Sequence, residues 1–147
     1  METQATYDDV NLILRLYELR REEKMRQARN WFAASFTART LDELNNLCPP
    51  GSETNAYFRM VISYWDMVAS FMTNGVLNER LFFQSGRELL FVWEKVRDIV
   101  PQVRAANKDD FILKNLETVA ISFIKWMERQ APESYNAYKN RLRAAPR

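Results

Sequence analysis

Apolar residues recur at helical spacing along almost the whole chain, and only three glycines and five prolines interrupt the pattern. A chain so poor in turn-forming residues does not fit an all-β fold, and the spacing predicts an all-α one. The chain has 147 residues, which is enough for one core that buries close to ~70% of the surface of the unfolded form. We therefore expect a single domain over residues 1–147, folded as a bundle of about five to six helices.

A long N-terminal helix is expected over about residues 6–36, where the apolar positions keep helical spacing. Its middle turns carry few apolar side chains, so they should pack on a narrow seam or project from the body. Residues 28–36 should dock on the bundle. The N-terminal leucines, Leu12 and Leu16, are then expected to pair with another chain or a partner.

Capping residues and helix breakers mark the other boundaries. Thr6 with Asp9 and Thr40 with Glu43 are typical of capping boxes, and the second box opens a short helix that Pro49-Pro50 ends.

A second long helix is expected over about residues 53–73, with Gly75 in the left-handed position past its end and Asn78 capping the next helix. The apolar pattern then runs from residue 79 to about residue 100 and breaks at Ser85-Gly86. If Gly86 has a positive φ, Gly86→Ala destabilises the protein, whereas in a continuous helix the same change stabilises it. The remaining boundaries are Pro101 near the end of that segment, a cap at Asn107 or Asp109, and Pro132 in the first turn of the last helix.

The helix expected over 53–73 is the most informative element, because more than half of its circumference is apolar and it must be covered on two sides. Trp65 lies at the centre of its wider apolar face and should be almost fully buried. Arg59 and Asp66 lie about two turns apart on the remaining polar strip and are candidate binding residues. The alternative is a solvated strip closed by ordinary hydrogen bonds or by a pairing to Arg97.

Three aromatic residues are candidates for an apolar-ligand pocket, namely Tyr57, Tyr64 and Trp93. The alternative interpretation is that the aromatic stripe is core packing.

The chain lacks the residues that most catalytic sites use, because it has no histidine and only one cysteine. Neither a histidine base nor a zinc cluster can be assembled, so we expect a protein that is not an enzyme and that needs no cofactor and no metal. Two exceptions stay open. Cys48 is a nucleophile only if something activates it, and a carboxylate-only metal site would have to use Asp66, Glu79, Glu88 or Glu94.

The charge balance is nearly neutral, with a net charge of +2, and does not indicate a nucleic-acid partner. Two basic regions, 15–39 and 139–147, could touch anionic lipid heads or an acidic partner, or could be solvated charges on a helix and a tail. The single cysteine and the lack of a signal sequence or of a long apolar run predict a cytoplasmic protein. Attachment to the inner face of the membrane is the alternative.

The chain resembles a bacterial family of uncharacterised small all-helical domains over roughly residues 26–143. The resemblance rests on Arg29-Asn30-Trp31, Tyr57-Phe58-Arg59, Tyr64-Trp65-Asp66, Asn74-Gly75-Val76-Leu77-Asn78-Glu79, Phe91-Val92-Trp93-Glu94 and Ala131-Pro132-Glu133-Ser134-Tyr135. It implies no catalytic residue and no substrate. Many members carry a membrane-spanning segment ahead of the first helix, but Leu12-Ile13-Leu14, which Arg15 interrupts, is too short to span.

These observations predict a non-enzymatic interaction or scaffolding module. Its expected partner is another protein or a second copy of the chain. Two alternatives belong to other classes, a sensor of a small apolar ligand and a peripheral membrane protein.

Overall fold

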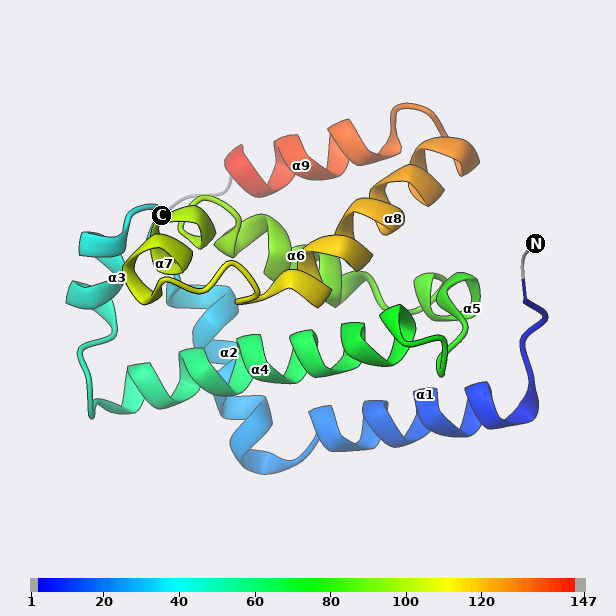
Figure 1. Cartoon of the computed structure of the whole chain (residues 1–147), viewed down its shortest axis with the longest axis horizontal. Coiled ribbons are helices and arrows are strands. Elements are labelled where there is room, and N and C mark those ends of the chain that lie inside the picture. The colour runs from blue at the N-terminus through cyan, green and yellow to red at the C-terminus, as the bar shows by residue number, and fades with distance from the viewer. Residues whose placement is uncertain (1–2, 145–147) are drawn as a thin grey trace.

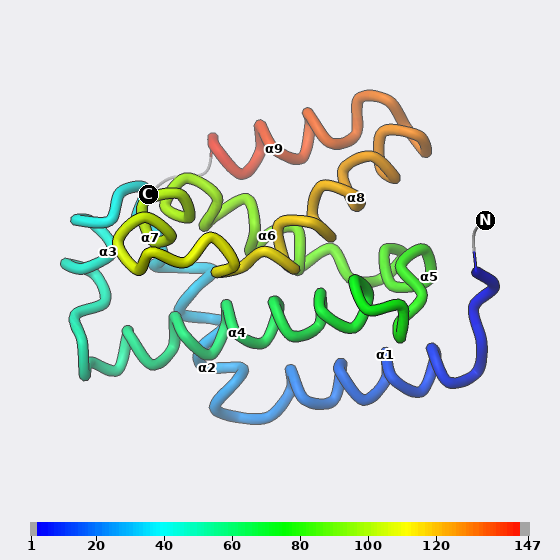
Figure 2. Tube along the Cα trace, viewed as in Figure 1, coloured from blue at the N-terminus to red at the C-terminus, as the bar shows by residue number. Residues whose placement is uncertain are grey.

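The computed structural model describes residues 3–144, and within this range it contains nine α-helices and no strand (Figures 1 and 2). The all-α prediction is confirmed, but the expected number of helices was too low. The helices are α1 (Tyr7–Arg20), α2 (Glu23–Ser35), α3 (Leu41–Leu47), α4 (Glu53–Thr73), α5 (Glu79–Phe83), α6 (Arg87–Val96), α7 (Val100–Asn107), α8 (Lys114–Gln130) and α9 (Ser134–Ala144).

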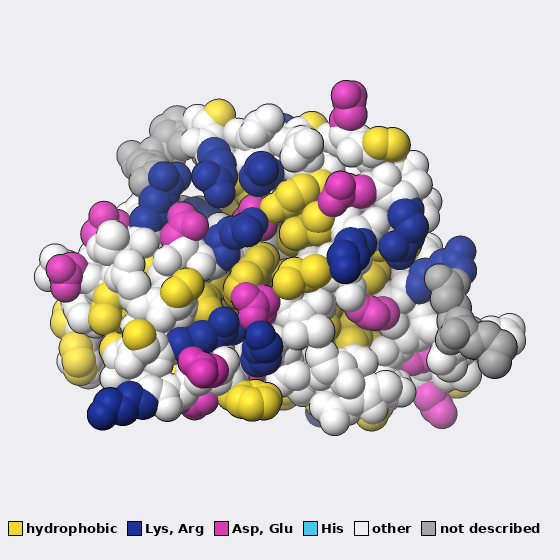
Figure 3. Space-filling view, turned by 45° about the horizontal axis from the view of Figure 1, so that its top comes forward, with side chains coloured by type: hydrophobic (Ala, Val, Ile, Leu, Met, Phe, Trp, Pro, Cys, Tyr) yellow, Lys and Arg dark blue, Asp and Glu magenta, His cyan; other side chains and the backbone are white. Residues whose placement is uncertain are grey.

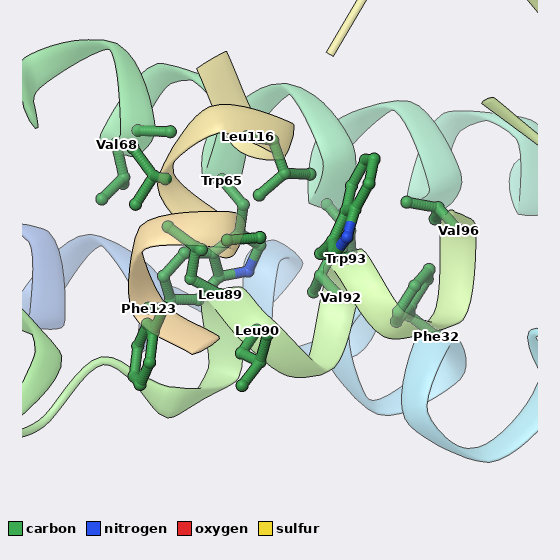
Figure 4. Packing of buried hydrophobic residues seen from close by; sticks show 14 of the residues in the cluster. Phe32, Trp65, Val68, Leu89, Leu90, Val92, Trp93, Val96, Leu116 and Phe123 are labelled. Carbon is green, nitrogen blue, oxygen red and sulfur yellow. The ribbon is translucent and has the colours of Figure 1, made fainter. Parts of the chain in front are cut away.

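Helix α4 forms the centre of the fold, as its two apolar faces predicted. It packs most extensively against α8 and α2, and α6 packs on both α4 and α8. Trp65 of α4 is only 1% exposed. Figure 4 shows its side chain among residues of α6 and α8, including Leu89 and Leu116. The core is therefore built where one broad apolar helix meets three others.

The prediction of one long helix over 6–36 is wrong, because the chain breaks at Arg21 and Glu22. Glu22 is not helical, with a ψ of 144°, and its carboxylate accepts a hydrogen bond from the Met25 N–H at 3.0 Å, which starts α2. Because of this break, α1 runs beside α4, whereas α2 turns away from α1 and crosses α4 (Figure 1). A straight helix would bury one narrow seam, whereas the two shorter helices cover more of the core.

The side chain of Arg29 on α2 links these two helices to each other and to α6. The Arg29 Nε and Nη2 atoms donate to the two carboxylate oxygens of Glu88 on α6, both at 2.7 Å. Arg29 Nη1 donates to the carbonyl of Arg20, the last residue of α1, at 3.1 Å. One guanidinium thus ties α1, α2 and α6 together with the fork geometry that suits a carboxylate.

The N-terminal leucines lie in the protein's own core, contrary to the expectation that they would pair with another chain. Leu16 is buried, and Leu12 and Ile13 pack against the core. The Tyr64 hydroxyl donates to the Leu16 carbonyl, so α1 also makes a polar contact with α4.

Several helix boundaries confirm the capping predictions. Thr6 and Asp9 form the capping box of α1, and Asn78 caps α5. Gly75 has a φ of +74° just past α4. Thr40 caps α3 as expected; the Glu43 carboxylate, however, accepts from the N–H of Arg39 rather than from that of Thr40.

The Ser85-Gly86 break is confirmed, but its cause is different from a positive φ. Gly86 has a φ of −102°. A Cβ atom on this residue would lie 2.3 Å from Cε1 of the Phe82 ring, so the glycine is needed for close approach. Phe82 and Phe83 are buried, and Phe83 packs on Phe123 with ring centroids 4.4 Å apart.

Three boundaries in the second half were predicted wrongly. Pro132 lies two residues ahead of the last helix, α9, and not in its first turn. Pro101 lies in the first turn of a separate helix, α7, where its missing N–H costs nothing, rather than near the end of the preceding one. Helix α8 starts at Lys114, and neither Asn107 nor Asp109 caps it. Its amide at Leu116 instead donates to the carboxylate of Asp66 on α4 at 3.0 Å. No local sequence pattern reveals a cap that comes from another helix.

Candidate functional site

The polar strip on α4 does not bring its two candidate residues to a common partner. Asp66 faces α8 and accepts from the Leu116 N–H, whereas Arg59 is exposed to solvent. Burial raises the pKa of Asp66, and the hydrogen bond from Leu116 opposes that shift. The expected pairing to Arg97 is not formed, because Arg97 donates to Glu94 and to the Tyr135 hydroxyl.

The three candidate aromatic residues lie at different places in the fold. The Tyr57 hydroxyl donates to Glu53, and its ring packs on Trp31 with centroids 6.1 Å apart. Tyr64 binds the Leu16 carbonyl, and burial raises its pKa to about 12. Trp93 lies in the core and is 5% exposed. None of the three lines either of the two hollows described below.

Two of the four carboxylates considered for a metal site form ion pairs, and Asp66 accepts the Leu116 N–H. Glu88 binds Arg29, and Glu94 binds Arg97. Across residues 3–144, no three Asp, Glu or Cys side chains gather closely enough to hold a metal ion. Cys48 is buried, and burial raises the pKa of its thiol, which is the opposite of what a reactive cysteine needs.

The outer face of α1 carries an exposed apolar stripe, at one end of which the guanidinium groups of Arg20 and Arg21 lie 4.9 and 5.6 Å from the centre of the Tyr17 ring. Tyr7, Val10, Leu14 and Tyr17 recur at intervals of three and four residues, so they lie on one side of the helix. Their exposed fractions are 77%, 40%, 54% and 48%. The opposite side of the same helix contributes Leu16 to the core. Helix α1 is therefore apolar on two faces, and the described chain covers only one of them.

A basic cleft opens between the chain leaving α2, α6 and the end of α9, with a volume of about 160 Å³. Four cationic side chains line it, namely Arg39, Lys95, Lys139 and Arg143. Figure 3 shows several Lys and Arg side chains gathered at the upper left of the molecule, the side on which α9 ends in Figure 1.

A broader hollow of about 680 Å³ lies between the segment before α1, the α4–α5 connection and α8. Its lining contains charged residues of both signs. Asp8 of α1 and Glu79 of α5 are acidic, and Lys125 and Arg129 of α8 are basic. Trp126 and other apolar side chains form part of its wall. Its mixed charges favour no particular ligand.

Sequence reasoning missed both surfaces for different reasons. The spacing of the α1 stripe is visible in the sequence, but it was assigned to one long helix with a single buried seam. The basic cleft draws on segments about a hundred residues apart, from Arg39 to Arg143. The two basic regions, 15–39 and 139–147, indicated part of it, because they contain Arg39 and the two cations from α9.

The described fold defines a small all-helical domain, and no helix in residues 3–144 is long and apolar enough to cross a membrane. The chain belongs to the protein family described as "Domain of unknown function (DUF4760)", which matches residues 5–126. This finding confirms the resemblance to a family of uncharacterised helical domains. Neither the curated proteins nor the solved structures contain a match to the chain.

Proposed function

We propose that the protein is a non-enzymatic interaction module that binds a second copy of itself through the outer face of α1. The observation that carries this proposal is the exposure of Tyr7, Val10, Leu14 and Tyr17 on a helix whose other face is already in the core. An apolar stripe in water forfeits on the order of 25 cal/mol for each Å² left exposed. A second helix laid along it would recover part of that free energy.

The stripe is complementary to itself in an antiparallel arrangement. Two α1 helices related by a two-fold axis at the level of Leu12 place Tyr7 opposite Tyr17 of the second copy. The same axis places Val10 opposite Leu14, so each aromatic residue meets an aromatic one and each aliphatic residue an aliphatic one. A parallel pair would place every residue against its own copy and would bring like charges together.

The charges on α1 favour the same arrangement. The first turn is acidic, with Asp8 exposed, whereas Arg15, Arg20 and Arg21 follow in the second half and are opposed there by Glu18 alone. In an antiparallel pair the acidic end of each helix lies against the basic end of the other, which steers the two copies into register. The stripe is only about three turns long, so we expect a weak dimer whose population depends on concentration.

A reducing cytoplasm is part of the proposal. Cys48 is buried and has no second cysteine to pair with, so the fold gains nothing from an oxidising compartment.

Sedimentation equilibrium of the full chain over a wide concentration range tests the proposal, together with the variant Leu14→Glu. We expect the average mass of the wild type to rise with concentration and that of Leu14→Glu to stay at the monomer value. Ile121→Glu is the matched control, since Ile121 is 46% exposed on α8, away from the stripe. It should associate as the wild type does. A wild type that stays monomeric throughout, or a control that loses association equally, contradicts the proposal.

Cysteine cross-linking tests the orientation of the pair. In the antiparallel dimer, a mixture of Tyr7→Cys and Tyr17→Cys proteins should form mainly the mixed disulfide on mild oxidation, because these two positions face each other. Each variant alone should cross-link poorly. Efficient cross-linking of Tyr7→Cys with itself would show a parallel pair and would overturn the proposed register.

A further inference from the structure

We propose that the basic cleft binds a phosphate monoester group, which Lys95 and three surrounding cations hold. This inference is independent of the proposed dimer. Part of the cleft wall comes from α9, and α9 lies on the side of the fold opposite to α1 (Figure 1).

Lys95 is the first reason for this assignment. It lies half-buried on α6, and the structure gives it no carboxylate partner among residues 3–144. Its ammonium lies 5.6 Å from the centre of the Phe91 ring, a contact that replaces only part of its lost hydration. Burial lowers the pKa of Lys95. A desolvated and unpaired cation is costly unless an anion binds it.

The charge balance of the lining is the second reason. Arg39, Lys139 and Arg143 join Lys95 in the cleft, against the carboxylates of Glu94 and Asp98. Glu94 is already bound by Arg97 and the Tyr135 hydroxyl, each at 3.0 Å, and its side chain is only 4% exposed.

Because Glu94 is already neutralised by its ion pair, the charges that remain in the lining are four cations and one carboxylate, that of Asp98. The excess of positive charge should lie at the mouth of the cleft, where it would attract an anion.

The size and chemistry of the cleft select the anionic group. A volume of about 160 Å³ equals the share of roughly five water molecules in the liquid. It is smaller than the ~300 Å³ or more that encloses a whole drug-sized ligand. A phosphate monoester carries about −1.5 to −2 charges and three acceptor oxygens on one small group. Two guanidinium forks and two ammonium groups match such a dianion better than they match a single carboxylate.

The rest of the ligand must lie outside the cleft. Two kinds of ligand carry a phosphate group that fits this description, a soluble phosphate ester and a lipid headgroup. The chemistry at the cleft is the same for both. An experiment with two arms therefore separates the sources.

The first arm titrates inorganic phosphate into the isotopically labelled full chain at constant ionic strength, with amide chemical shifts as the readout. We expect saturable shifts confined to residues 36–39, 91–98 and 139–143. Lys95→Gln should bind phosphate at least about tenfold more weakly, since one charge-assisted contact is lost. Lys24→Gln, which removes an exposed lysine from α2, is the matched control and should bind as the wild type does.

Thermal unfolding shows that a loss of binding by Lys95→Gln is not a loss of folding. Without phosphate, this variant should be at least as stable as the wild type, because it no longer buries an unpaired charge. Phosphate should raise the Tm of the wild type and not that of the variant. A variant that binds phosphate as tightly as the wild type, or shifts that spread over the surface without saturating, overturns the proposal.

The second arm uses phosphatidylcholine vesicles that contain either a phosphatidylinositol phosphate or phosphatidylserine at matched surface charge. Binding that requires both the phosphate monoester and Lys95 assigns the site to a lipid headgroup. Binding of inorganic phosphate without vesicle binding assigns it to a soluble ester. Equal binding to both kinds of vesicle, unchanged in Lys95→Gln, shows general charge attraction and overturns the proposal.

Discussion

The carboxylate of Asp9 joins the start of α1 to the start of α5 by accepting the backbone N–H of Asn78 at 2.8 Å. Its other oxygen accepts the N–H of Thr6, also at 2.8 Å, within the capping box. Asp9 is 7% exposed and is the buried charged residue of the described chain. Asn78 in turn donates its side-chain amide to the Thr3 carbonyl, so the N-terminal segment is fastened at two points.

Replacing Asp9 with asparagine should destabilise the protein by about 1–3 kcal/mol, because an amide cannot accept all of the hydrogen bonds that the carboxylate accepts. Urea unfolding at neutral pH measures this loss. The adjacent Asp8→Asn is the control, since Asp8 is exposed, and its effect should stay within about 0.5 kcal/mol. Equal losses in the two variants would contradict the structural role of Asp9.

The same residue should make stability depend on pH. The hydrogen bonds from Thr6 and Asn78 lower the pKa of Asp9 in the folded protein. Its contribution to stability is therefore complete above the ordinary carboxyl pKa of about 3.9 and is lost as the pH falls through the lowered folded value. The difference in stability between the wild type and Asp9→Asn should shrink on acidification. A difference that stays constant down to that pH range would show that the charge of Asp9 is not the cause.

Trp65 should tolerate phenylalanine far better than alanine. Its side chain is almost fully buried, so Trp65→Ala should cost about 3–5 kcal/mol. Its indole N–H is buried without a hydrogen-bond partner in the described part of the chain, and a group of that kind costs about 1–3 kcal/mol.

Phenylalanine keeps an aromatic ring and removes that donor, so Trp65→Phe should cost less than about 2 kcal/mol. Urea unfolding of the two variants gives the comparison. Equal costs would show that the N–H is satisfied in solution.

Gly86→Ala should destabilise the protein by about 1–3 kcal/mol through overpacking, because the added methyl group would overlap the Phe82 ring. Thermal unfolding of a double-mutant cycle with Phe82→Ala measures the overlap, and the double variant should recover most of the loss due to Gly86→Ala.

Gly75→Ala is the contrasting control. Gly75 has a φ of +74° and no atom near the position of an added Cβ, so its cost of about 1 kcal/mol comes from the backbone. Phe82→Ala should not recover it. Recovery at both glycines, or at neither, would contradict the close approach at Gly86.

The sequence by itself determined the all-α fold, the central position of α4 and most helix starts, because these depend on local rules. Periodicity reports which face of a helix is apolar, and Thr6, Asn78 and Gly75 act on residues within a turn of themselves. Burial of Trp65 followed from the same periodicity. These predictions needed no knowledge of which helix packs against which.

Tertiary structure alone decided the features that depend on a partner distant in the sequence. The bend between α1 and α2 depends on Arg29 reaching both Arg20 and Glu88, and the start of α8 depends on a carboxylate from α4. The basic cleft exists because α6 and α9 bring Lys95 and Lys139 to the same opening. The packing of three helices around α4 determines which side chains become neighbours. The residue pattern along one helix does not indicate which side chains of another helix will contact it.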